Sequence, residues 1–124
     1  THMHKIFDYV NDHGAQAIVP ALDKPPHEFE SLLHVFRTAL EHEHEVTAAV
    51  NERVGLAFRE NDFATFNFLL WFVGEQREEE TLFHRIVDMV EMVGDDGHAI
   101  YIVDREIGQL EDGGGGAEAG AAEA

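Results

Sequence analysis

The chain has 124 residues, of which 44% are apolar and none is cysteine, so it can form one domain with a hydrophobic core but neither disulfides nor thiolate metal sites. Its 25 acidic and 8 basic residues give a formal charge of −17, which disfavours nucleic acid and anionic membranes as partners and favours cations. No apolar run approaches the roughly 20 residues that a membrane span needs. Because the lack of cysteine suits a reducing compartment, we expect a cytoplasmic protein; adaptation to high salt is an alternative source of the acidity.

The first predicted element is the end of a helix at residues 1–13, where Met3, Ile6 and Val10 recur at helical spacing. This pattern is already under way at the first residue, and no initiator methionine precedes it, so we expect a fragment of a longer protein. Residues 14–30 follow, with three prolines and no strand alternation. Such a connection can span on the order of 50 Å, which is typical of a crossover along the length of a helical bundle.

Two long helices are predicted next, at residues 31–60 and 62–93, because apolar side chains recur at steps of three and four through both. Ser31 is the predicted N-cap of the first of these helices. Asn61 and Asp62 form the turn between them, and Asp62 is the predicted N-cap of the second. The two helices are therefore expected to form an antiparallel hairpin.

A short amphipathic helix is predicted at residues 98–110, after an Asp-Asp-Gly sequence that ends the preceding helix. Residues 111–124 are rich in glycine, alanine and glutamate, which predicts a disordered acidic tail. Residues 1–110 are accordingly expected to form one all-α domain.

Polar residues interrupt the apolar stripes of the hairpin at three positions. Gln76 and Glu79 fall between apolar positions of the second long helix, and Glu43 falls in the stripe of the first. Glu43 and Glu79 each lie 18 residues from Asn61, so in an antiparallel hairpin they stand at one height, roughly 27 Å from the turn. Gln76 lies less than one turn away from them. Two inward carboxylates at one height are expected either to share a proton or to bind a cation.

Several neighbouring residues are expected to have ordinary roles. A run such as Glu78-Glu79-Glu80 is most often a solvated helix face, and only its register with Glu43 singles out Glu79. Glu80 is expected on the surface, paired with Arg77 or His84. Residues two apart point to opposite sides of a helix, so the two histidines of EHEHE cannot bind one metal ion together. The aromatic residues of TFNFLLWF are expected to pack in the core.

Four segments resemble, in the same order, segments of the bacterial non-haem ferritins: THMHKIFDYVNDHG, LEHEHEVT, TFNFLLWFVGEQREEETLF and AIYIVDREIGQL. The resemblance covers about residues 1–110 and implies a ferritin-like four-helix bundle with a long crossover and a short fifth helix. It also implies that the first helix and the first half of the second are absent from this chain. Family members form hollow cages of 24 subunits that oxidise ferrous iron with dioxygen or peroxide and store it as a ferric mineral, without haem.

The resemblance further implies a set of metal-site residues, namely His2, Glu43, Gln76, Glu79, Glu75 and Glu78. His2 corresponds to a ligand of the first iron of a di-iron ferroxidase centre, whereas Glu43 and Glu79 correspond to ligands of the second. Gln76 corresponds to a glutamine beside the two irons, and Glu75 and Glu78 to acids of a third iron site. We refer to these residues as the six predicted ligands.

The sequence departs from the family pattern because the glutamate that bridges the two irons would lie three positions before His2, outside the chain. Ferroxidase activity is therefore expected of the parent protein and is open for this chain alone. One alternative is another ferritin-like di-iron protein, such as a bacterioferritin or a rubrerythrin-type enzyme. Another is a non-catalytic ferritin subunit or fragment that co-assembles with an intact ferritin.

Overall fold

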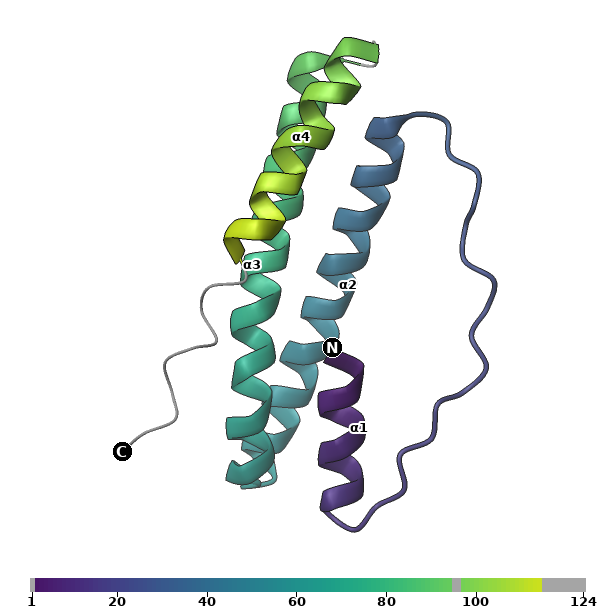
Figure 1. Cartoon of the computed structure of the whole chain (residues 1–124). Coiled ribbons are helices and arrows are strands. Elements are labelled where there is room, and N and C mark those ends of the chain that lie inside the picture. Colours follow the sequence, from purple (N-terminus) through teal and green to yellow (C-terminus); the bar gives the residue numbers. More distant parts are fainter. Residues whose placement is uncertain (1, 95–96, 115–124) are drawn as a thin grey trace.

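A computed structural model describes residues 2–94 and 97–114. In this part of the chain there are four α-helices and no strand, namely α1 (His2–Asp12), α2 (Leu32–Arg59), α3 (Phe63–Val93) and α4 (Gly97–Gly114). The long helices α2 and α3 form the antiparallel hairpin, α1 lies beside the half nearest their turn, and α4 folds back along the far end of α3 (Figure 1). The fold is therefore all-α, as predicted. No helix of the described residues is both long enough and apolar enough to cross a membrane.

Side-chain caps set the ends of the hairpin helices. The Ser31 hydroxyl accepts a hydrogen bond from the backbone N–H of His34 at 3.0 Å, which confirms the predicted start of α2. Asp62 accepts the N–H of Thr65 at 3.0 Å and the Thr65 hydroxyl at 2.6 Å. These hydrogen bonds from Thr65 lower the pKa of Asp62. Asn61 completes the turn with a φ of 57°, a left-handed conformation that asparagine tolerates better than most residues.

The predicted apolar stripes face the inside of the hairpin. Leu40 and Ala57 of α2 and Phe72 of α3 are buried. Other apolar residues of the stripes are half-buried, namely Leu33, Phe36, Val50, Val54, Leu69 and Phe83. The most buried cluster lies at the end of the hairpin away from the turn, where Ile86 and Val90 of α3 contact Val103 of α4. The beginning of α2 adds partly buried side chains to this cluster. The helix α4 is thus held by apolar burial against α3.

The connection between α1 and α2 contains no helix or strand, and almost all of its residues are exposed. It runs as an extended segment along the open side of the hairpin, as expected for a crossover (Figure 1). Gly14, which ends α1, has a φ of 79°, where glycine is favoured. The helix α1 itself has no buried residue.

The last helix differs from the prediction at its C-terminal end. It continues to Gly114, four residues into the segment predicted as a disordered tail. The prediction ended this helix too early because it relied on the low-complexity composition of the segment. Glutamate and aspartate, at positions 111 and 112, are compatible with a helix. The remainder of the predicted tail, 115–124, lies outside the described residues.

Candidate metal site

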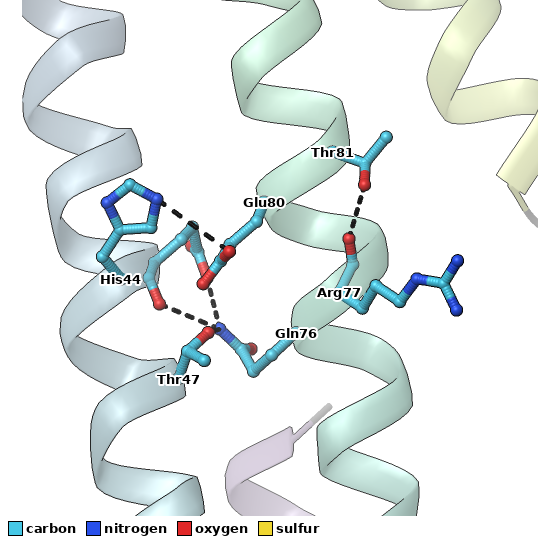
Figure 2. A network of polar contacts seen from close by, with 7 residues as sticks. His44, Thr47, Gln76, Arg77, Glu80 and Thr81 are labelled. Carbon is cyan, nitrogen blue, oxygen red and sulfur yellow. Dashed lines mark hydrogen bonds and ion pairs between the residues drawn. The ribbon is translucent and has the colours of Figure 1, made fainter.

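The centre of the candidate site is Gln76, whose side chain is only 3% exposed although it is polar. Its Nε2 donates to Glu43 Oε2 at 3.0 Å and lies 3.2 Å from the Glu43 carbonyl oxygen. The Thr47 hydroxyl oxygen lies 3.4 Å from the same nitrogen. Figure 2 shows Gln76 reaching from α3 toward Thr47 on α2. These contacts confirm the predicted register of the hairpin, in which Gln76 and Glu43 stand at nearly one height.

Glu79 lies one turn farther along α3 and is half-buried. Burial raises the pKa of its carboxyl group, and the charge of Glu43 across the hairpin raises that pKa further. The nearby charges of Glu75 and Glu78 act in the same direction, while His2 opposes them. Glu79 therefore sits where acidic groups accumulate, and a cation bound among them would relieve their repulsion.

His2 is held near this region by α3. Its Nε2 lies 3.3 Å from Glu75 Oε2, and its ring packs edge-on against Trp71 and Phe72 at centroid distances of 5.5 and 5.9 Å. The ammonium group of Lys5, one turn along α1, lies 3.8 Å from the centroid of the Trp71 ring. Trp71 and Phe72 are thus packing residues, as predicted, and they also position the histidine.

The structure gathers all six predicted ligands on one stretch of α3 and the parts of α1 and α2 that face it. Four of them influence the pKa of Glu79, and Gln76 contacts one of those four. The donors are carboxylate oxygens, an imidazole nitrogen and an amide, which is the donor chemistry that suits iron or manganese. Among the described residues, however, no three acidic or histidine side chains already surround one point closely enough to hold a metal ion.

Two contacts were absent from the sequence prediction. Thr47 joins the Gln76 network. It lies four residues after Glu43 on α2 and therefore shares a helix face with it, which was the available signal. Glu80 is half-buried and faces His44 of α2 at 3.9 Å, so its predicted pairing with Arg77 or His84 was wrong. The pairing of Glu80 with His44 could have been predicted from the hairpin register, which places these two residues at similar heights.

Comparison with known proteins identifies the family of this chain. A profile of the ferritin family, described as a ferritin-like domain, matches residues 1–93. The chain belongs to the ferritin family. It is 44% identical over 109 residues to a probable bacterial non-heme ferritin-like protein of Haemophilus influenzae, covering 88% of this chain and 66% of that protein. It is 38% identical over 111 residues to the bacterial non-heme ferritin of Escherichia coli O157:H7, covering 90% of this chain and 67% of that protein.

Solved structures give the same assignment. An open pore ferritin from the archaeon Archaeoglobus fulgidus superposes with a TM-score of 0.82 at 40% identity, over 86% of this chain and 65% of that one. The ferritin of Chlorobium tepidum superposes with a TM-score of 0.73 at 37% identity. This homologue of bacterial non-heme ferritins thus spans about two thirds of the length of the relatives that it matches.

Proposed function

We propose that this ferritin homologue is part of an iron-storage protein that oxidises Fe(II) to Fe(III) at a di-iron centre and keeps the product as a ferric mineral. One observation carries the proposal: Glu43 and Glu79 face one region from opposite helices, with the buried amide of Gln76 bound to Glu43. An unpaired inward carboxylate is unfavourable, and two of them are more so. A bound cation gives this arrangement a physical reason.

The resemblance to the bacterial non-haem ferritins supplies the proposed roles of the six predicted ligands. Glu43 and Glu79 would hold one ferrous ion, and His2 would bind the other from the α1 side. Gln76 fixes the direction of the Glu43 carboxylate by its hydrogen bond at 3.0 Å. Glu75 and Glu78, on the same stretch of α3, would bind a third ion on its way to or from the pair.

The chemistry requires no protein nucleophile. Carboxylate oxygens stabilise the higher charge of Fe(III), so that loss of an electron from each ion becomes easier. Two ferrous ions release two electrons, which dioxygen takes up with two protons to give hydrogen peroxide; peroxide as the oxidant would give water. Iron is thus the substrate and the stored product, and no haem takes part.

The proposal extends to the intact protein, which would form a homo-oligomeric cage of 24 subunits in the cytoplasm. The formal charge of −17 would attract ferrous ions toward the protein surface. Because salt screens such attraction, uptake of iron should slow as ionic strength rises.

Ferrous oxidation in air tests the assignment of the site. Formation of Fe(III), followed by its absorbance, should slow at least about tenfold on Glu43→Ala or Glu79→Ala, because each change removes a direct ligand. Glu45→Ala is the matched control, since Glu45 is an exposed glutamate on α2 two residues from Glu43. Unchanged oxidation in both Glu43→Ala and Glu79→Ala would refute the assignment.

A non-catalytic ferritin subunit is the second candidate, because no three potential ligands of the described residues already enclose one point. Such a subunit would bind Fe(II) without oxidising it and would gain activity only in a mixed assembly with an intact ferritin. Oxidation of iron without any mineral-filled assembly would favour a different ferritin-like di-iron protein, such as a rubrerythrin-type enzyme. Oxidation rate and particle size, measured together on the purified chain, separate these candidates.

A further inference from the structure

A second cluster of potential metal ligands lies beside the Gln76 contacts, between α2 and α3. Nε2 of His44 on α2 lies 3.9 Å from Oε2 of Glu80 on α3. The rings of His44 and His84 are 5.5 Å apart between centroids. Glu80 and His84 are four residues apart on one helix, so their side chains share a face. None of these three residues belongs to the six predicted ligands.

The three side chains do not enclose one point as they stand, but two of their separations are close to those of a metal site. Two donors bound to one ion at about 2.1 Å each are separated by at most about 4.2 Å, and His44 and Glu80 are already within that limit. Two imidazoles on a tetrahedral ion have ring centroids roughly 5 Å apart, close to the observed separation of His44 and His84. Small rotations of these side chains would therefore bring the three donors around one ion.

The side chains have room for such rotations. The side chains of His44 and Glu80 are 48% and 27% exposed. Glu80 and His84 line an open cavity of about 270 Å³, whose remaining wall is formed by Thr47, Asn51, Val73, Arg77 and Thr81. Figure 2 shows the ring of His44 directed toward Glu80, while the guanidinium of Arg77 points away from both. Arg77 thus lines the cavity, but its guanidinium is directed away from the space between His44 and Glu80.

We propose that His44, Glu80 and His84 form a second site, which binds one divalent transition-metal ion and links α2 to α3. Two imidazoles and one carboxylate are a ligand set that zinc and ferrous iron both accept. An anion is disfavoured there, because the carboxylate of Glu80 would repel it and the guanidinium of Arg77 is turned away. The ligands of this site differ from those of the di-iron centre, although His44 follows Glu43 and Glu80 follows Glu79. Consecutive residues point about 100° apart on a helix, so each pair faces two different regions.

Titration of the full chain with Co²⁺ tests this site, because visible absorbance reports nitrogen and oxygen coordination and calorimetry reports the number of ions. We expect His44→Gln and His84→Gln each to weaken binding of one ion at least about tenfold, as removal of a direct ligand should. His42→Gln is the matched control, an exposed histidine of α2 two residues from His44, and should leave that ion in place. Far-UV circular dichroism checks that the variants keep their helices.

Two results would overturn the proposal. One is an unchanged number of ions and unchanged affinities in both His44→Gln and His84→Gln. The other is loss of the same ion in Glu79→Gln, which would assign that ion to the region of Glu43 and Glu79. Retention of the ion in Glu79→Gln, with loss in His84→Gln, supports an independent site whether or not the chain oxidises iron.

Discussion

Replacement of Gln76 by alanine should measure how strongly the candidate site holds α2 and α3 together. Gln76 is the one buried polar residue among the described residues, and its amide bridges to Glu43 and Thr47. Gln76→Ala removes these hydrogen bonds together with the carboxamide group and one buried methylene group. The helix itself should tolerate the change, because alanine has the highest helix propensity.

The magnitude follows from these contacts. A hydrogen bond to a charged group contributes about 1.5–3 kcal/mol, and each buried methylene about 0.8 kcal/mol. Because Glu43 is only half-buried, water replaces part of its lost hydrogen bond, and we expect the lower end of that range. Gln76→Ala should therefore lower the free energy of unfolding by about 2 kcal/mol, of which about 1.5 kcal/mol belongs to the bond with the Glu43 carboxylate.

A double-mutant cycle of Gln76→Ala and Glu43→Ala isolates that bond, with urea unfolding followed by circular dichroism as the assay. Glu43→Ala keeps the backbone carbonyl that lies 3.2 Å from Gln76 Nε2, so the coupling energy reports the carboxylate alone. Combining Gln76→Ala with Glu45→Ala should be additive, since Glu45 is exposed. A coupling energy below about 0.5 kcal/mol between Gln76 and Glu43 would refute the reasoning, because such a value equals ordinary non-additivity.

Other parts of the structure give three further predictions. The pKa of Glu79 is higher in the folded protein than in the unfolded chain, so above its unfolded-state pKa its negative charge destabilises the metal-free fold. Glu79→Gln should therefore raise the melting temperature at neutral pH and have no effect below about pH 4. Glu45→Gln, a change at an exposed glutamate of α2, is the matched control. Asp62→Ala should lower the melting temperature at neutral pH, and the difference from wild type should shrink as pH falls through the lowered pKa of Asp62. Val90→Ala, at a side chain 1% exposed, should cost about 1.5–3 kcal/mol in urea unfolding, whereas Met92→Ala, at one 84% exposed, should cost less than about 0.5 kcal/mol.

The hairpin could be predicted from the sequence because local signals and periodicity agreed there. Ser31 and Asp62 are capping residues at the starts of two regular stripes, and both cap their helices in the structure. The equal distances of Glu43 and Glu79 from the turn then gave the register. The contact of Gln76 with Glu43 follows from that register and helix geometry alone.

The detailed pairing of side chains could not be predicted in the same way. Glu80 has Arg77 and His84 within one helical turn, which favoured a local pair, yet it faces His44 on the other helix. Local spacing shows which partners are within reach, whereas the choice among them depends on rotamers and on the distance between the helices. The contact of His2 with Glu75 has the same origin, because it depends on how α1 lies against α3.

The crossover between α1 and α2 has a consequence for how His2 reaches the site. The helix α1 has no buried residue, so the covalent tether, together with a few surface contacts such as Tyr9 with Thr65, keeps it near α3. Docking of α1 is then equivalent to binding of a ligand present at an effective concentration on the order of millimolar. Any ion that binds His2 together with residues of α3 favours the docked arrangement by mass action. If the proposed centre includes His2, occupancy by metal and attachment of α1 would be two readouts of a single equilibrium.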